Sequence, residues 1–236
     1  TKYPNHEAFK ISTRMIPAKS VGGDFYDFFF IDDDNFAIVV ADVSGKGIPA
    51  ALYMMKAQTL IRNISKSEPQ IDQIFYHVNN QLYEGNDTCM FVTAFMGIIN
   101  LKNGEIRCVN AGHTPPIVGN YGHHRFLNPE RNIILGIKKN ATFKTRVIQL
   151  NPGDHFLLYT DGVTEAENAK NQFYGPERLM KIMEKATSDP DKNLKLILNG
   201  IQKFVKDAQQ SDDITMLDLV YLGYKNKIKL PADDKK

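Results

Sequence analysis

Cysteine is scarce in this sequence, where Cys89 and Cys108 are the only two among 236 residues. Two cysteines are too few for a disulfide framework, and these two do not have the spacing of metal ligands. A single bridge between them is compatible with the sequence. Low cysteine content is more typical of a reducing cytosol than of secretion, so we expect a cytoplasmic protein.

Long hydrophobic runs are also missing. No apolar stretch approaches the roughly 20 residues of a membrane span. The first residues, TKYPNHEAFKIS, have neither the basic nor the apolar region of a signal peptide. Because the chain starts without Met and soon enters a strand-like segment, we expect one domain, residues 1–236, that forms the C-terminal part of a longer protein.

An excess of one charge sign is absent too. The chain has 29 basic and 27 acidic residues, mixed along its length, and a formal net charge of +2. Nucleic-acid-binding proteins usually show a basic patch or stripe, so we expect no nucleic-acid partner. With 42% hydrophobic and 24% charged residues, the composition is that of an ordinary globular protein.

The apolar pattern predicts strands and helices that do not alternate strictly. Residues 25–31 and 36–43 are short apolar runs joined by the turn DDDN, which predicts an antiparallel hairpin. Helical spacing or composition predicts helices, and short apolar runs between turn signals predict further strands. The helices are expected at 48–66, 70–84, 175–186 and 191–206, and the strands at 89–101, 105–112, 117–127, 143–150, 155–162 and 213–222. This order predicts an α+β fold, an antiparallel β-sandwich flanked by helices, rather than a doubly wound parallel sheet.

Six aspartates lie in the hairpin segment GGDFYDFFFIDDDNFAIVVADVSGKG, residues 22–47. If the turn is centred between Asp33 and Asp34, Asp24 lies opposite Val43 and Phe25 opposite Asp42. Both arms then deliver an aspartate to the same open end. The turn aspartates at 32–34 are expected to form only local hydrogen bonds.

Aspartates stand at the ends of two other predicted strands. Asp161 follows the run HFLLYT, and Asp212 and Asp213 precede the run ITMLDLV. If these ends converge on Asp24 and Asp42, the carboxylates repel one another unless a cation joins them. An all-oxygen set without nearby Cys or paired His favours Mg²⁺ or Mn²⁺, and two such ions would activate a water and hold phosphate oxygens.

Five segments, taken in order, resemble the SpoIIE-like or RsbU-like branch of the metal-dependent protein phosphatases, relatives of the type 2C phosphatases. They are PAKSVGGDFYDF, VADVSGKGIPAALYM, NAGHTPPIV, LYTDGVTEAEN and SDDITMLDLV. The resemblance runs from about residue 10 to residue 222. It implies a type 2C-like sandwich with two Mn²⁺ or Mg²⁺ ions, which hydrolyses phosphoserine or phosphothreonine on a protein without a phosphoenzyme.

The resemblance also implies roles for single residues. Asp42 would bridge both ions, the Val43 carbonyl would bind one, and Asp24 would act on the same side. Asp161 and Asp212 would complete the second ion, with Asp213 as the alternative ligand. Asp27, which we place on the same face as Asp24, is an outer candidate at best.

Some residues depart from the type 2C pattern, and others lie outside it. Val43-Ser44 replaces the Gly-His that follows the bridging aspartate, and Arg14 is the candidate by position for the phosphate-binding arginine. Leaving-group protonation is therefore unassigned. We expect His113 to pack or form hydrogen bonds, and His123-His124 to lie on a hairpin surface. Lys46 in SGKG lacks the spacing of a phosphate loop.

The expected function is therefore that of a metal-dependent serine/threonine phosphatase in a bacterial signalling protein. By resemblance, its partners are a phosphorylated anti-sigma-factor antagonist and an upstream sensor domain in the same chain, and the helices at 48–66 and 70–84 are candidates for a homodimer contact. A catalytically silent binding domain is the alternative, although the full aspartate set argues against it. A diguanylate cyclase would share the GGD at 22–24 but needs an acidic residue where Phe25 stands.

Overall fold

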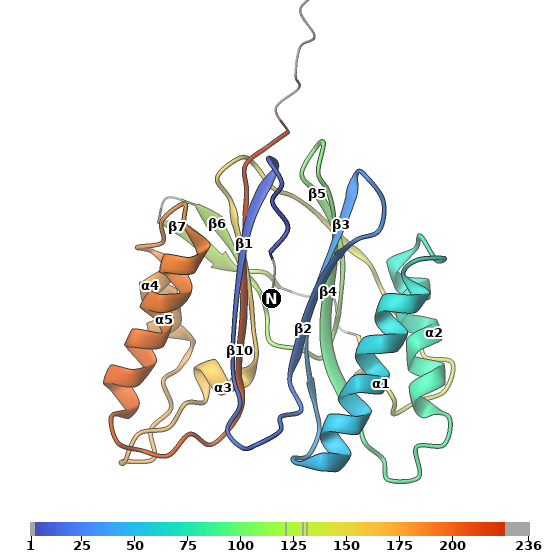
Figure 1. Cartoon of the computed structure of the whole chain (residues 1–236), viewed down its shortest axis with the longest axis horizontal. Helices are drawn as coiled ribbons and strands as arrows, with labels where there is room; N and C mark the ends of the chain where they lie inside the picture. Colours follow the sequence, from blue (N-terminus) through green and yellow to red (C-terminus); the bar gives the residue numbers. More distant parts are fainter. Residues whose placement is uncertain (1–2, 121, 129, 131, 225–236) are drawn as a thin grey trace, which may run out of the picture.

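Two antiparallel sheets of five strands stack face to face in the computed structural model, which describes residues 3–120, 122–128, 130 and 132–224. Helices cover the outer face of each sheet (Figure 1). The first sheet has the order β1-β10-β9-β6-β7 and the second the order β2-β3-β4-β5-β8. The predicted α+β sandwich is therefore confirmed.

The strands form at the predicted apolar runs, except that the run at 117–127 is divided into two strands. Those of the first sheet are β1 (Phe9–Ile16), β10 (Ile214–Tyr221), β9 (His155–Tyr159), β6 (Ile117–Asn120) and β7 (His123–Phe126). Those of the second are β2 (Phe25–Phe30), β3 (Asn35–Val43), β4 (Val92–Asn100), β5 (Glu105–Ala111) and β8 (Arg146–Gln149).

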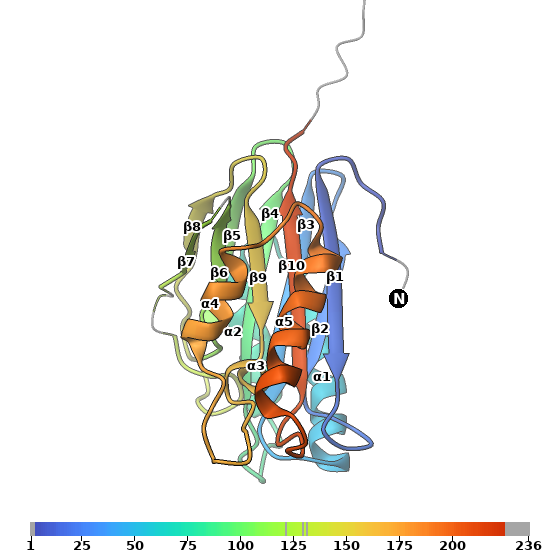
Figure 2. The same ribbon diagram turned by 90° about the vertical axis from the view of Figure 1, so that its left-hand side faces the viewer.

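The four predicted helices also form. Helices α1 (Ile48–Ile64) and α2 (Ile71–Tyr83) cover the second sheet, and α4 (Pro176–Met183) and α5 (Pro190–Val205) cover the first (Figures 1 and 2). A short fifth helix, α3 (Asp161–Thr164), begins where β9 ends. Within the described ranges, no helix is both long and apolar enough to cross a membrane.

Strand β3 shows why the central run FAIVVADV has no polar alternation. Phe36, Ile38 and Val40 pack between the two sheets, against residues that include Phe156 and Leu217 of the first sheet. The intervening residues Ala37, Val39 and Ala41 face the helices α1 and α2. Both faces of β3 are therefore buried, so an apolar side chain is favoured at every position.

The register of the β2–β3 hairpin differs by one residue from the predicted register. Phe25 pairs with Ala41 and Phe30 with Phe36, so the same register sets Asp24 across from Asp42. The reason lies in the turn, where the Asp32 carboxylate accepts hydrogen bonds from the backbone N–H groups of Asp34 and Asn35. The turn is thereby centred on Asp33 and not between Asp33 and Asp34.

The first and last strands of the described chain lie side by side. β1 pairs with β10 along eight residues, from Phe9–Tyr221 to Ile16–Ile214. β10 also pairs with β9, so the last strand is in the interior of its sheet. The loops before β10 and after β9 therefore come to the same end of the first sheet.

Candidate active site

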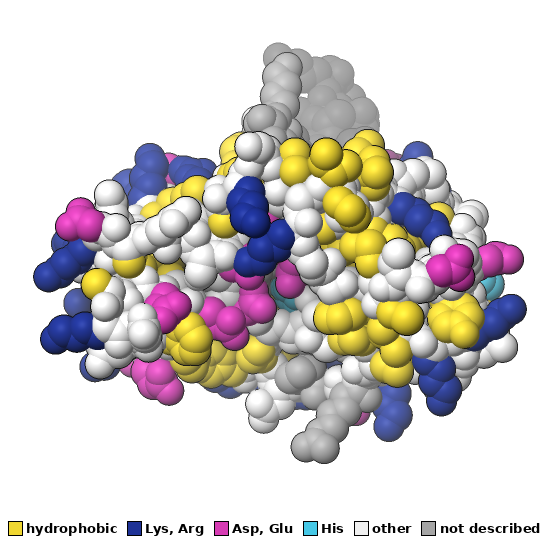
Figure 3. Space-filling view, turned by 90° about the horizontal axis from the view of Figure 1, so that it is seen from below, with side chains coloured by type: hydrophobic (Ala, Val, Ile, Leu, Met, Phe, Trp, Pro, Cys, Tyr) yellow, Lys and Arg dark blue, Asp and Glu magenta, His cyan; other side chains and the backbone are white. Residues whose placement is uncertain are grey.

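The predicted site aspartates lie at one end of the sandwich, at the bottom in Figure 1, where loops of both sheets meet. Asp24 and Asp42 come from the β2–β3 hairpin of the second sheet. Asp161 follows β9, and Asp212 and Asp213 precede β10, in the first sheet. Seen from below, acidic side chains gather near the middle of this face with hydrophobic side chains around them (Figure 3).

Asp24 is the most enclosed of these carboxylates, with 2% of its surface exposed. Its Oδ2 accepts a hydrogen bond of 2.8 Å from the hydroxyl of Thr160, which precedes Asp161. Burial, with the nearby charges of Asp42 and Asp213 as smaller causes, raises the pKa of Asp24 to about 8. The Asp24 carboxylate thus connects the β2–β3 hairpin of the second sheet to the end of β9 in the first sheet.

Asp42 is affected by carboxylates from the opposite sheet. Burial, followed by the charges of Asp161 and Asp212, raises the pKa of Asp42 to about 7. The pKa of Asp161 is raised by burial and by the charge of Asp212. Together with the hydrogen bond between Thr160 and Asp24, these interactions join strand ends of both sheets, so the predicted convergence is present in the structure.

Asp212 and Asp213 are neighbours with different surroundings. The buried carboxylate of Asp213 accepts hydrogen bonds from the backbone N–H groups of Ala18, at 2.8 Å, and Gly23, at 2.9 Å. Asp212 is half-exposed, and one of its oxygens lies 3.1 Å from Nζ of Lys46. Asp213 therefore fastens the loop between β1 and β2, whereas Asp212 keeps an accessible carboxylate.

The two glycines before Asp24 allow the backbone to come close to both neighbours. A Cβ atom at Gly22 would lie 2.1 Å from Oδ2 of Asp213, and one at Gly23 would lie 2.8 Å from the Val43 carbonyl oxygen. Any side chain at either position would displace a site group. The GGD sequence thus has a steric reason that does not involve a cyclase.

Asp27 does not belong to this cluster, and the prediction that it shares a face with Asp24 is wrong. The two aspartates are three positions apart, an odd number, so their side chains point to opposite faces of the sheet. Asp27 accepts two hydrogen bonds from the guanidinium of Arg62 in the last turn of α1, with Nε at 2.8 Å from Oδ2.

Two other basic candidates have partners of their own. Arg14 forms an ion pair with Asp191 in the first turn of α5 and donates to the Thr13 carbonyl at 2.7 Å. Lys46 donates to the Ser211 carbonyl at 2.7 Å, beside its contact with Asp212. Lys46 therefore reaches the acidic cluster, while Arg14 is tied to α5.

The histidine predictions have mixed outcomes. His113 is buried, and its Nδ1 lies 3.0 Å from the Thr93 hydroxyl, which agrees with a packing and hydrogen-bonding role. Burial lowers the pKa of His113 to about 4. His123 is exposed as expected, but His124 is half-buried, with its ring centroid 5.6 Å from that of buried His155. The assignment of His124 to the surface is therefore wrong.

The donor groups fit a hard cation in their chemistry. Four carboxylates and the Val43 carbonyl offer only oxygen. The raised pKa values of Asp24, Asp42 and Asp161 reflect burial first and then carboxylate repulsion, which a cation would relieve. Within the part of the chain that the structure describes, no three His, Cys, Asp or Glu side chains are arranged closely enough to form a ready-made metal cage. Cys89 and Cys108 are both free thiols.

The residues that hold the site aspartates in place were not predicted from the sequence. Thr160 holds Asp24, and Thr160 also accepts a hydrogen bond from the backbone N–H of Thr215 at 3.0 Å. The only sequence signal was indirect, a hydroxyl residue next to the strand-end aspartate. Such contacts depend on how the two sheets stack, which no local pattern contains.

Comparison with known proteins gives a family and a fold. Residues 32–220 match the family model described as Stage II sporulation protein E (SpoIIE). The chain is 31% identical over 241 aligned residues to Protein IcfG of Synechocystis, covering 91% of this chain and 38% of that protein. It is 30% identical to Phosphoserine phosphatase RsbU of Bacillus subtilis, covering 93% and 65% of the two chains.

Solved structures agree on the fold. The SiaA-PP2C domain of Pseudomonas aeruginosa matches with a TM-score of 0.80 at 20% identity, over 89% of this chain and 85% of that one. RsbX, solved in complex with magnesium, matches with a TM-score of 0.69 at 18% identity, over 92% and 98%. At these identities the likeness establishes the fold alone. The described chain spans less than two thirds of each of the two relatives named above.

Proposed function

The chain belongs to the SpoIIE family, and on that basis we propose that it is a metal-dependent phosphatase that hydrolyses phosphoserine or phosphothreonine on a regulatory protein. The relative RsbU, a phosphoserine phosphatase by name, supports this assignment. The observation that carries it is the convergence of Asp24, Asp42, Asp161 and Asp212 from both sheets, where burial and then neighbouring carboxylate charges raise the pKa of Asp24, Asp42 and Asp161.

Asp42 and the Val43 carbonyl, with Asp24, Asp161 and Asp212, are the residues that would hold the cations. Metal dependence is general among phosphatases of this superfamily, and we propose two Mn²⁺ or Mg²⁺ ions. Bound there, the ions would supply an activated water and neutralise phosphate charge. Asp213 is the less suitable ligand, because two backbone N–H groups already occupy its carboxylate.

The remaining residues position this set. Thr160 orients Asp24 through its hydroxyl, and Asp213 fixes the glycine loop so that Gly23 lies against the Val43 carbonyl. Lys46 balances part of the charge of Asp212 at the exposed rim. These contacts orient Asp24 and the glycine loop, as outer partners of metal ligands commonly do.

The substrate we propose is a phosphorylated anti-sigma-factor antagonist, in keeping with the SpoIIE family resemblance. We place the reaction in the cytoplasm, where thiols such as Cys89 and Cys108 stay reduced. The alternative function is a catalytically silent domain that binds the same kind of regulatory protein.

Hydrolysis of p-nitrophenyl phosphate and of a phosphoserine peptide, with and without Mn²⁺, tests the proposal. We expect Mn²⁺-dependent turnover that falls at least about 100-fold in Asp42→Asn, because this substitution removes a charge that the cations need. Asp34→Asn is the matched control, since Asp34 lies in the far turn and pairs with Lys102. A wild-type protein without turnover and without bound cation by elemental analysis would favour the silent binding domain.

A further inference from the structure

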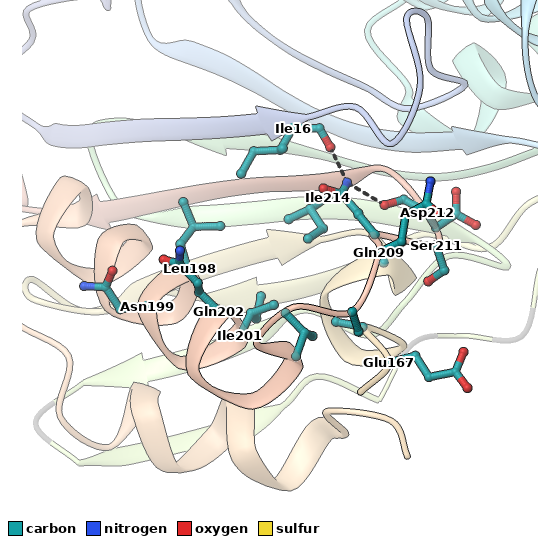
Figure 4. Close-up of a pocket in the computed structure, with 15 residues that line it drawn as sticks. Ile16, Glu167, Leu198, Asn199, Ile201, Gln202, Gln209, Ser211, Asp212 and Ile214 are labelled. Carbon is teal, nitrogen blue, oxygen red and sulfur yellow. Dashed lines mark hydrogen bonds between the residues drawn. The ribbon is translucent and has the colours of Figure 1, made fainter. Parts of the chain in front are cut away.

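An apolar groove of about 470 Å³ begins beside the aspartate cluster (Figure 4). One wall is the face of α5 that carries Leu198, Ile201 and Val205. The other wall contains Ile16 at the end of β1 and Ile214 at the start of β10. Ile16 is 37% exposed, so the groove presents hydrophobic surface to solvent at the point where the sheet ends.

The groove is continuous with the acidic site. Asp212, which precedes β10, and Gly162, which follows Asp161 of the cluster, also line the groove. Gln210 fastens this junction, because its Nε2 donates to the carbonyls of Ile16, at 2.8 Å, and Asp212, at 2.7 Å. The segment before β10 is thereby joined to the end of β1 where the groove meets the site.

The lining chemistry restricts what could lie in the groove. Neutral amide side chains also line the groove, among them Asn199, Gln202 and Gln209, and none of the described residues that line it is Lys or Arg. Its two charged residues, Glu167 and Asp212, are both acidic. An anionic ligand such as a phosphate group is therefore disfavoured, whereas an apolar peptide segment would bury hydrophobic surface and find amide partners for its backbone.

We propose that this groove binds an apolar segment of the phosphoprotein substrate, adjacent to the phosphorylated residue. The inference rests on the proposed phosphatase function, because the groove acquires this role only if the phosphate is held beside Asp212. A protein chain with its phosphate at the cluster passes the mouth of the groove, and its apolar side chains can enter between α5 and β10. Selection among phosphoproteins then depends on the sequence beside the phosphoserine and not on the phosphate alone.

Two pairs of short phosphoserine peptides test the proposal. In one pair the variable segment precedes the phosphoserine, and in the other pair it follows the phosphoserine. Within each pair, one peptide has leucines in this segment and the other has glycine and serine in their place. We expect the wild type to prefer one leucine peptide by about tenfold in kcat/KM, the effect of burying one large apolar side chain. The variants Leu198→Gln and Val205→Gln should lose this preference. p-Nitrophenyl phosphate, which has no peptide segment, should be hydrolysed at the wild-type rate by both variants.

Leu196→Gln is the matched control, because Leu196 lies on α5 with 42% exposure but does not line the groove. It should keep the leucine preference. Fluorescence anisotropy with the same peptides in unphosphorylated form gives a readout without turnover, and there the groove variants should bind more weakly than the wild type.

The outcomes separate this inference from the proposed function. If p-nitrophenyl phosphate and all peptides are left intact by the wild type, the phosphatase assignment fails. If turnover is normal but the wild type does not distinguish the peptides, or if the groove variants keep the preference, the groove is not the substrate site. Equal loss on all substrates would also overturn the proposal, since it would indicate a structural effect on the cluster.

Discussion

At the scale of single residues, neighbouring aspartates in this chain have been given different tasks by their surroundings. Asp212 and Asp213 are adjacent in sequence, yet one side chain is half-exposed near Lys46 and the other is buried under backbone donors. In the same way Asp24 faces the cluster, while Asp27 faces α1. Residue type alone therefore does not identify a ligand, because the partner of each carboxylate decides what it can do.

Replacement of the two neighbours should separate these tasks. We expect Asp213→Ala to lower the free energy of unfolding by about 2 kcal/mol or more, because it leaves the backbone N–H groups of Ala18 and Gly23 without an acceptor. Asp212→Ala should change stability by only about 0.5 kcal/mol but weaken Mn²⁺ binding. Urea denaturation and calorimetric titration measure the two effects. If instead Asp213→Ala is stable and fails to bind Mn²⁺, Asp213 is the ligand.

At the scale of elements, α1 is fixed to the second sheet at the helix end far from Asp42. The helix begins six residues after Asp42 with Ile48, and its last turn carries Arg62, which binds Asp27 of β2. The guanidinium also lies over the Phe29 ring, 4.7 Å from its centroid. Since Asp27 is 7% exposed, loss of Arg62 would leave a buried carboxylate without its counter-charge.

Truncation of this contact tests how α1 is anchored. Arg62→Leu should destabilise the protein by about 2 kcal/mol, and the double variant Asp27→Leu/Arg62→Leu should recover most of the loss, because no unpaired charge remains. Lys56→Leu on the same helix is the control and should have little effect. Equal stability of Arg62→Leu and the wild type in urea would show that the pair does not anchor the helix.

The positions of helices and strands were the part of the structure that the sequence predicted best. Short apolar runs and helical spacing predicted the strands and the four longer helices, because both depend on local pattern. The hairpin register was wrong by one residue, since it depends on hydrogen bonds of the Asp32 side chain inside the turn. The contacts of Asp24 with Thr160 and of Asp213 with Gly23 could not be predicted, because they join segments more than 130 residues apart.

At the scale of the whole molecule, the acidic cluster places repulsion at the junction of two sheets. Two carboxylates, Asp24 and Asp42, have pKa values of about 8 and about 7 against an ordinary value of 3.8. Between the ordinary pKa of 3.8 and these raised values, the two carboxyl groups bind more protons in the folded chain than in the unfolded chain. Stability without cations is therefore greatest at low pH and falls as the pH rises through this range.

The pH dependence of unfolding should show this effect. In a chelating buffer, we expect the free energy of unfolding to decrease between about pH 5 and about pH 8, and Asp42→Asn to make the decrease smaller. Mn²⁺ should restore stability at the higher pH, because a cation replaces the protons. Urea denaturation at several pH values measures both. A cation-free protein that gains stability over this range would contradict the raised pKa values.

The position of β10 inside its sheet has a consequence for the order of events during synthesis. Of the described strands β10 is the last to leave the ribosome, yet β1 and β9 pair with it and not with each other. β1, made first, must therefore wait without its partner for some 200 residues of translation. We expect slow folding, dominated by long-range pairing, and a nascent chain whose β1 edge needs protection from other chains until β10 arrives.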